Sequence, residues 1–516
     1  MPGISVKFML FFSARFNAVT EASGARQRAP DRRMLLENES LKTFSLNLAS
    51  TSPAWLTRAL IERRHPMRPA PVTRSLLVTL LVTLPETLLA ALLALASQAA
   101  LAVDLAPTVA LRVDPEHRLA PANAAVLRGY NFGNWMQVSE FTEALHQAPT
   151  AALRFPGGNV GDDEDMGGNK LDFFKLNLQL MGEPRPELLI QTRVFQNRNN
   201  EPAANGPQDA AHGVLLARER GMKVPVWEIG NEPDLFAVTR GDPSWTAERY
   251  CEVFRAQAAA IKREDPAALI AGPAVSGSMP AAPDFAKRFL KLCGDVVDVF
   301  TWHIYPTDGS GSEAEALASV SEATRWPAEY RRLLADPEAN PLGHGRRYEL
   351  GVTEYGLSWR TDSQRFIGEQ SGALWAAEFA LRSAESELRF AHYFAYQGTG
   401  FHGLLDNGGA PRATYYGFRL LAPLAGDFVE AASNDSQLWT HAVRDGSHLS
   451  IVLINSSEAK RRVITGLPAW RLRGGRSFDK RLVADEKKFA RVRPSAFVTL
   501  RARSMAVLDY EMLSSH

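Results

Sequence analysis

The sequence predicts an α/β fold, a (β/α)8 TIM barrel, followed by a smaller C-terminal antiparallel β-sandwich domain. Between residues 125 and 398, eight short apolar segments alternate with helical or loop segments. These segments are apolar on both faces, as strands of a parallel sheet covered by helices are. From residue 425 onward, alternating strand patterns separated by turns replace the helices. A doubly wound sheet is the main alternative, but the turn after the first strand, YNFGNW, lacks the GxGxxG pattern.

The predicted strands and helices follow one another in regular order. The strands lie within residues 125–133, 151–159, 186–196, 223–233, 267–273, 296–306, 346–356 and 389–398. Helical spacing of apolar residues covers 171–182, 208–221, 244–265, 282–293, 312–336 and 372–386. Ser244 or Thr246 is the expected N-cap of the long third helix. Pro233, which has no N–H for a strand ladder, is predicted to end the fourth strand.

The pattern divides the chain into five parts. Residues 1–66 are interpreted as an extension upstream of the natural start at Met67 or as a disordered segment. Residues 67–102 form a signal peptide or a membrane anchor, and 103–126 are lead-in strands that join the β-sandwich. The barrel then occupies 127–424 and the β-sandwich 425–516.

The apolar run at residues 75–102 indicates export. Three arginines precede it and it ends in Ala-Leu-Ala, which is typical of a secretory signal, although Pro85 interrupts it. The alternative is a single membrane tether through the same residues. In both cases we expect the folded part to begin near Val103 and to be extracytoplasmic, either secreted or periplasmic.

Composition excludes several classes of function. The formal net charge is +1, so no overall field gathers nucleic acid, and we expect no nucleic-acid partner. The two cysteines, Cys251 and Cys293, lie in no metal-binding pattern, so we expect no metal and no cofactor. A disulfide between them fits an oxidising compartment, and the sequence alone leaves it open.

Polar and aromatic residues stand where the predicted strands end, which in such a barrel is where functional groups gather. They are Asn131, Arg154, Asn231, Glu232, His303, Tyr305, Glu354 and Gln397. Glycoside hydrolysis requires two carboxylates on either side of one bond, and a retaining pair lies roughly 5 Å apart. Glu232 and Glu354, on strands four and seven, are the predicted pair. Glu228 lies deeper on strand four and is expected to be a buried structural acid.

Three motifs carry a resemblance to a known group of enzymes. WEIGNEPD at 227–234 and GVTEYG at 351–356 resemble the catalytic strands of the clan A retaining glycoside hydrolases. LRFPGGN at 153–159 resembles a motif of the α-L-arabinofuranosidases, and WEIGNEPDLF is similar to a stretch of the heparanase and β-glucuronidase family. The resemblance extends from about residue 127 to 400.

The resemblance implies a role for each site residue. Glu232 would be the general acid/base, with a pKa raised partly by the charge of Glu354, the nucleophile. Asn231 would bind the sugar 2-hydroxyl, while Tyr305, His303 and Arg154 would hold the nucleophile. Asn131, Trp359 and Gln397 would complete the substrate-binding ring. For His303 a packed strand-end histidine, and for Arg154 a structural ion pair, are the alternatives.

The acidic run GDDEDMGG at 161–168 offers several carboxylates but lacks the spacing of a calcium-binding EF-hand loop. We interpret it as a solvated acidic loop, whose charge would disfavour a uronic acid if it lay over the site.

Two classes of function follow. The first is a retaining glycoside hydrolase of plant or microbial polysaccharide, arabinofuranosidase-like, with a β-glucuronidase/heparanase-like hydrolase of uronic-acid glycosides as the alternative. The second is a non-catalytic carbohydrate-binding barrel or an envelope scaffold. The paired glutamates favour the enzyme.

Overall fold

The computed structural model describes residues 106–136, 138–195, 205–276, 282–360, 362–398, 400–481 and 489–513. The expected signal or anchor segment, and residues 1–66 before it, lie outside these ranges. No helix in the described part of the chain is long and apolar enough to cross a membrane.

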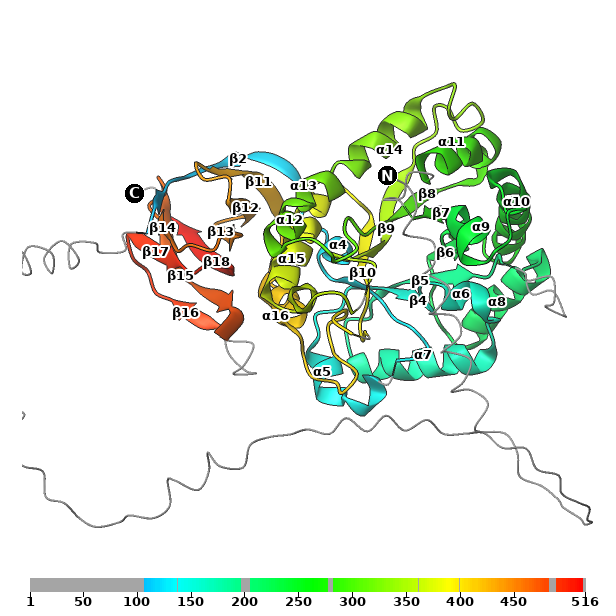
Figure 1. Ribbon diagram of the computed structural model, residues 1–516, viewed down its shortest axis with the longest axis horizontal. Helices are drawn as coiled ribbons and strands as arrows, with labels where there is room; N and C mark the ends of the chain where they lie inside the picture. Colours follow the sequence, from blue (N-terminus) through cyan, green and yellow to red (C-terminus); the bar gives the residue numbers. More distant parts are fainter. Residues whose placement is uncertain are drawn as a thin grey trace, which may run out of the picture. The chain divides into compact units, whose positions relative to one another are not determined.

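Eight parallel strands close into a barrel, which confirms the predicted fold (Figure 1). They are β3 (Gly129–Asn131), β4 (Ala152–Phe155), β5 (Glu187–Thr192), β6 (Val226–Ile229), β7 (Leu269–Val275), β8 (Val299–Ile304), β9 (Glu349–Tyr355) and β10 (Phe390–Tyr393). Pairing of β10 with β3, which places His392 opposite Gly129, closes the ring. Each predicted strand segment coincides with one of these strands in the expected order, although β7 extends two residues beyond its predicted segment.

Helices follow the strands and pack on the outside of the barrel, as α7, α8, α10 and α11 do in Figure 1. The longer ones are α7 (Gly168–Met181), α8 (Pro207–Glu219), α10 (Ala247–Glu264), α11 (Ala282–Cys293), α14 (Trp326–Ala335), α15 (Gln370–Glu385) and α16 (Ala413–Leu421). The shorter ones are α4 (Ala124–Leu127), α5 (Thr142–Gln147), α6 (Val160–Asp163), α9 (Phe236–Thr239), α12 (Glu313–Ala318) and α13 (Val320–Ala323). Single 3-10 turns are η1 (Val138–Glu140), η2 (Pro233–Leu235), η3 (Gly294–Val296) and η4 (Arg365–Ile367).

Two local predictions have clear outcomes. Thr246, not Ser244, caps α10, because its side chain accepts the N–H of Arg249. The fourth strand ends at Ile229 rather than at Pro233, since Gly230 takes a φ of 84° that breaks the strand. Pro233 instead begins η2, where its missing N–H is harmless.

The remaining strands form two sheets that confirm the predicted C-terminal β-sandwich. A seven-stranded sheet has the order β16-β15-β18-β13-β12-β11-β2, and a three-stranded sheet has the order β1-β14-β17. Their bounds are β1 (Thr108–Val109), β2 (Leu111–Pro121), β11 (Asp427–Ser433), β12 (Leu438–Asp445), β13 (His448–Asn455), β14 (Arg461–Ile464), β15 (Trp470–Asp479), β16 (Ala490–Val492), β17 (Phe497–Leu500) and β18 (Ser504–Met512). The lead-in strands β1 and β2 pair with β14 and β11.

The two cysteines form a disulfide that joins α10 to α11. Cys251 lies in the second turn of α10 and Cys293 is the last residue of α11, with Cα atoms 5.9 Å apart. Packing of these two neighbouring helices brings together residues 42 positions apart, which the sequence could not show.

Helix α15 connects the barrel to the seven-stranded sheet through a buried charge cluster. His441, on β12, bonds Glu378 through Nε2 (2.9 Å) and Glu385 through Nδ1 (2.7 Å), and Glu378 also accepts from Arg382 (2.6 Å). Burial opposes a charge on His441, but the two glutamates outweigh it and raise the pKa of this imidazole to about 10. His441 is therefore a buried cation that links sheet and helix.

Replacing His441 by glutamine should lower the free energy of unfolding by roughly 3 kcal/mol, because Glu378 and Glu385 lose the buried cation between them and Glu378 keeps only Arg382. A raised histidine pKa stabilises the fold fully below the unfolded value of about 6.5, and this contribution is lost as pH rises through about 10. Urea unfolding of the parent protein and of His441→Gln between pH 6 and 11 measures this contribution to the free energy of unfolding. The difference should shrink toward pH 11, and His448→Gln, on an exposed strand end, should show none. A pH-independent difference would contradict the assignment.

Candidate active site

Glu232 reaches the barrel mouth from the segment that follows β6. Its φ of 47° and ψ of 50° lie in the left-handed region, which side chains other than glycine rarely adopt. The N–H of Glu232 donates to the carbonyl oxygen of Ala274 (2.9 Å), and Pro233 fixes the next residue. The fold thus holds this one carboxyl in a backbone conformation that costs about 1–3 kcal/mol.

Glu354 lies on β9 and is almost fully buried. One carboxylate oxygen accepts from Nη1 of Arg154 (2.7 Å), and the other accepts from the hydroxyl of Tyr305 (2.8 Å). Burial, followed by the charge of Glu354, raises the pKa of Tyr305 well above 10, so its hydroxyl remains a donor. Both oxygens of Glu354 are therefore oriented by donors, one that follows the neighbouring strand β8 and one on β4, on another side of the barrel.

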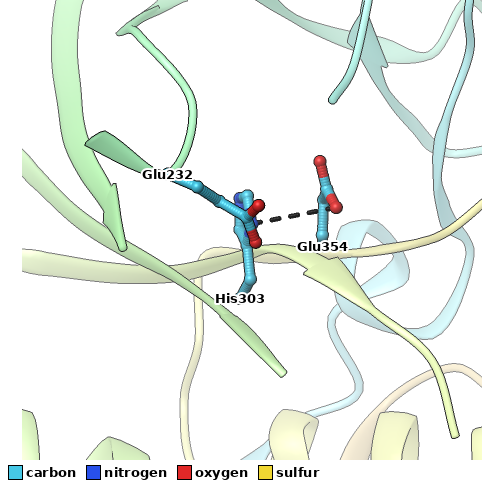
Figure 2. Close-up of side chains that lie close together, drawn as sticks. All are labelled: Glu232, His303 and Glu354. Carbon is cyan, nitrogen blue, oxygen red and sulfur yellow. Dashed lines mark hydrogen bonds and ion pairs between the residues drawn. The ribbon is translucent and has the colours of Figure 1, made fainter. Parts of the chain in front are cut away.

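Glu232 and Glu354 converge, with His303 between them (Figure 2). The ligand-capable atoms of the three residues lie within 4.8 Å of one another. Carboxyl groups of retaining glycosidases lie about 5–5.5 Å apart, and those of inverting enzymes about 6.5–9.5 Å. The pair therefore has the short spacing of a retaining enzyme, which leaves no room for a water molecule between the second carboxylate and the anomeric carbon.

The two carboxyls have different surroundings, because Glu354 is paired with the cation of Arg154, whereas Glu232 is hydrogen-bonded to the neutral His303. Burial raises the pKa of Glu232 to about 7, although the charges of Arg154 and Arg240 lower it in part. Glu232 is therefore about half protonated at pH 7, and its protonated form can donate a proton. Burial, rather than the charge of Glu354 that the resemblance implied, is the leading cause of this shift.

His303 stands at the end of β8 with no exposed surface. Its Nδ1 lies 3.0 Å from Glu232 and 3.7 Å from Glu354. Burial lowers the pKa of His303 below 6.5, while the charge of Glu354 opposes the shift. A neutral imidazole thus shares a hydrogen bond with the acid and orients it.

Arg154, on β4, lies beneath the pair and is completely buried. Its Nε donates to Glu228 (2.5 Å), Nη1 to Glu354 (2.7 Å) and Asn131 (3.1 Å), and Nη2 to Asn231 (2.9 Å). One guanidinium therefore connects four residues of the site through a fixed fork of donors.

Glu228 confirms the expectation of a buried structural acid. It has no exposed surface, and besides Arg154 it accepts from the hydroxyl of Thr301 (2.8 Å). It supports the arginine from below and stays away from the mouth.

The two asparagines differ in what they leave for a substrate. Asn131 donates to the carbonyl oxygens of Thr353 (2.9 Å) and His392 (3.1 Å) and accepts from Arg154, so its side chain is occupied beneath the site. Asn231 accepts from Arg154 and donates to Asn159 at 3.3 Å, which uses one of its two amide N–H groups. Of the two, Asn231 is the one with a donor left for a sugar.

Trp359 and Gln397, the two remaining predicted substrate-binding residues, differ in their exposure to solvent. Trp359, in the segment after β9, exposes 44% of its surface and is free to stack on a sugar ring. Gln397 is buried and donates to the backbone carbonyl oxygens of Asp406 (3.1 Å) and Asn407 (3.4 Å). It holds the loop that follows β10.

The acidic loop at 161–168 is solvated as expected at Asp163, Glu164 and Asp165, but Asp162 departs from the expectation. Asp162 is fully buried and accepts from the backbone N–H groups of Val194 (2.8 Å) and Asn231 (3.0 Å). Burial raises the pKa of Asp162 to about 6. The other acids pair with cations, Asp163 with Arg240, Glu164 with Lys170 and Asp165 with Arg193. Asp162 thus anchors the segment that carries the acid/base, a role that a run of four acids does not reveal in sequence.

Glu232, His303 and Glu354 could each offer one ligand atom to a metal ion. A cation there would compete with the guanidinium of Arg154 and displace the hydrogen bonds from Tyr305 and His303. The donor set suits proton transfer better than metal binding.

No family model matches the chain. Among characterised proteins, the chain is 26% identical over 210 residues to rat (Rattus norvegicus) heparanase. The matched residues make up 39% of this chain and 37% of heparanase. The chain is 24% identical over 262 residues to a beta-xylosidase of Caldicellulosiruptor saccharolyticus, which covers 47% of this chain and 50% of the xylosidase. The chain thus spans half or less of the length of these relatives.

Similar solved structures cover most of the chain. An α-L-arabinofuranosidase from Thermotoga maritima superposes with a TM-score of 0.61 at 16% identity, over 78% of this chain and all of that one. A monomeric beta-xylosidase from Caulobacter crescentus superposes with a TM-score of 0.56 at 17% identity, and the match covers 79% of this chain and all of the xylosidase chain. A Paenibacillus polymyxa xyloglucanase of glycoside hydrolase family 44 gives 0.56 at 15%, again over 79% and its full length. The chain therefore shares the barrel-and-sandwich fold of these glycoside hydrolases.

Proposed function

We propose that the protein is a retaining glycoside hydrolase with Glu354 as nucleophile and Glu232 as general acid/base. The observation that carries the proposal is their placement, with carboxylate oxygens within 4.8 Å at the ends of β6 and β9 and with opposite surroundings. Paired carboxyls whose environments differ in this way are typical of acid and nucleophile.

In the first step, Glu354 attacks the anomeric carbon and forms a glycosyl ester, while Glu232 protonates the departing glycosidic oxygen. Arg154 and Tyr305 hold the attacking carboxylate in place, and His303 orients the acid. In the second step, the now ionised Glu232 takes a proton from water, and the resulting hydroxide equivalent displaces Glu354. Two inversions at the anomeric carbon give net retention.

For the sugar that is cleaved off, we propose a neutral, arabinofuranosidase-like residue. The support is the charge balance around the mouth, because Arg154, Arg193 and Arg240 each already pair with a carboxylate of the protein. A sugar carboxylate would find these cations engaged. The likeness to heparanase keeps a uronic-acid glycoside as the alternative.

Hydrolysis of a panel of 4-nitrophenyl glycosides by the chain from Val103 onward tests the proposal. We expect release of nitrophenol from α-L-arabinofuranoside or β-D-xyloside. Cleavage of the β-D-glucuronide alone would establish the alternative specificity. Binding of oligosaccharides without turnover of any glycoside or polysaccharide would instead support a non-catalytic carbohydrate-binding barrel.

The pH dependence of hydrolysis should follow Glu232. Because this carboxyl must be protonated to donate and its pKa is about 7, kcat/KM should be about half its maximum at pH 7. More than about one pH unit above this midpoint, it should fall about tenfold per pH unit. Initial rates on a substrate with a poor leaving group measure this decrease of kcat/KM with rising pH. For Glu232→Gln, kcat/KM on a substrate whose leaving group needs no protonation should show no such decrease. A midpoint near 4.5 would contradict the buried acid.

We further propose that the protein acts outside the cytoplasm. The Cys251–Cys293 disulfide supports this location, since such bonds persist in oxidising compartments. Sequencing the N-terminus of the mature protein after expression in a secreting host would test cleavage after Ala102.

A further inference from the structure

A cavity of about 1010 Å³ lies between the mouth-side loops of the barrel and three turns of the β-sandwich. Its barrel wall comes from the segments after β8, β9 and β10, and its sandwich wall from the turns after β13, β15 and β17. Tyr305 and Glu354 stand at the ends of two of the same strands, yet neither lines the cavity. The cavity is therefore separate from the catalytic pair but bordered by the same loops.

The carboxylates of three of its acidic residues are engaged with arginines. Glu369 pairs with Arg365 at 3.0 Å. Glu313 and Glu458 lie 3.7 and 3.4 Å from Arg503. Because Arg503 serves two glutamates, these three carboxylates meet only two arginines.

The four acids and four cations of the cavity wall balance in number, but two of the cations make no ion pair within the described part of the chain. Among the described residues, Arg412 and Lys480 have no carboxylate within 4.0 Å, the limit for an ion pair, although both line the cavity. Arg412 donates through Nη2 to the carbonyl oxygen of Gly400, and its Nε has no partner there. The fourth acid, Asp406, instead accepts backbone N–H groups of its own turn.

The rest of the wall suits a sugar. Gln370 is only 5% exposed, and neither its amide oxygen nor its nitrogen has a partner among the described residues. A buried amide without partners is costly unless a ligand or water satisfies it. Phe366 and Phe401, both partly buried, add aromatic surface to the wall. Apolar surface with a few convergent polar groups is typical of a small-ligand site.

We propose that this cavity is a second carbohydrate-binding site, which takes an acidic sugar of the oligosaccharide substrate. The carboxylate of that sugar binds Arg412 and Lys480, its hydroxyls meet the amide of Gln370, and its ring packs on Phe401. The inference rests on the proposed function and extends it. The catalytic pair removes a neutral sugar, while the cavity binds an acidic unit of the same polymer.

Calorimetry on the full chain carrying Glu354→Ala, which prevents turnover, tests the site. The probes are xylotetraose with and without a glucuronic acid branch, and tetragalacturonate. At least one acidic probe should bind about tenfold more tightly than xylotetraose, because a charge-assisted pair discriminates by about this factor. Lys480→Ala and Arg412→Gln should each remove that preference.

Controls separate this site from the catalytic one. Lys223→Ala, an exposed lysine just before β6 at the opposite end of the barrel, should bind as the parent does. In the active protein, Lys480→Ala should leave hydrolysis of the small nitrophenyl glycoside unchanged, and since Lys480 is exposed the variant should fold normally. Equal binding of acidic and neutral probes, or a preference that survives both substitutions, would overturn the cavity assignment while leaving the hydrolase intact. Cavity binding without any glycoside turnover would overturn the proposed function instead.

Discussion

Glu354→Ala should lower kcat by roughly 10⁴- to 10⁶-fold, the range seen when a catalytic nucleophile is removed. The substitution deletes the carboxylate that Arg154 and Tyr305 hold toward the sugar, so no glycosyl ester forms. The rate of nitrophenol release under saturating substrate measures the loss. The cavity left behind is small, and the circular dichroism spectrum should be that of the parent.

Azide distinguishes the two glutamates. Added to Glu232→Ala, it attacks the glycosyl ester in place of activated water and yields a glycosyl azide of retained configuration. Added to Glu354→Ala, any azide product has the inverted configuration. Glu349→Ala, at the other end of the same strand and paired with Arg389, is the matched control and should keep full activity. Residual activity of Glu354→Ala within tenfold of the parent would exclude Glu354 as nucleophile.

Arg154→Met should destabilise the protein by roughly 3–5 kcal/mol and abolish hydrolysis. The guanidinium is completely buried between Glu228 and Glu354, and its removal leaves two carboxylates without their counter-charge. Burial would then favour protonation of one of them, and a protonated Glu354 cannot attack. Chemical denaturation and initial rates measure the two losses.

A second substitution separates the structural from the catalytic loss. Arg154→Met combined with Glu228→Gln removes the deeper of the two stranded charges, so part of the stability should return while hydrolysis stays absent. Arg220→Met, which breaks an exposed pair with Asp172, should leave the unfolding midpoint unchanged. If Arg154→Met unfolds with the parent's midpoint, the buried network does not stabilise the fold.

The fold and the site could be predicted from sequence where strands and helices alternate regularly and where a polar residue stands at the end of a strand. Eight apolar segments with helices between them indicate a parallel sheet covered on both faces, and eight such units are the number that closes a barrel. A glutamate at the end of the fourth and of the seventh strand then has to face the same mouth. For this reason Glu232, Glu354, Tyr305 and Arg154 could be placed together before any contact was known.

The acidic loop has contacts that its own sequence could not predict. Asp162, Asp163, Glu164 and Asp165 look solvated in sequence, since their partners, such as Arg193 and Arg240, lie tens of positions away. Ser244 and Thr246 are equally good caps in sequence, and only the direction of the chain before α10 selects Thr246.

By itself, the sequence determined the barrel, the sandwich and the convergence of Glu232 and Glu354, because these depend on periodicity and on position along a strand. Only the tertiary structure decided that Cys251 pairs with Cys293, that His441 is a buried cation, and that burial prepares Glu232 as an acid. It also decided that Arg412 and Lys480 face a cavity without a carboxylate of their own. The reason is physical: protonation, pairing and desolvation depend on atoms that come close in space from distant parts of the chain.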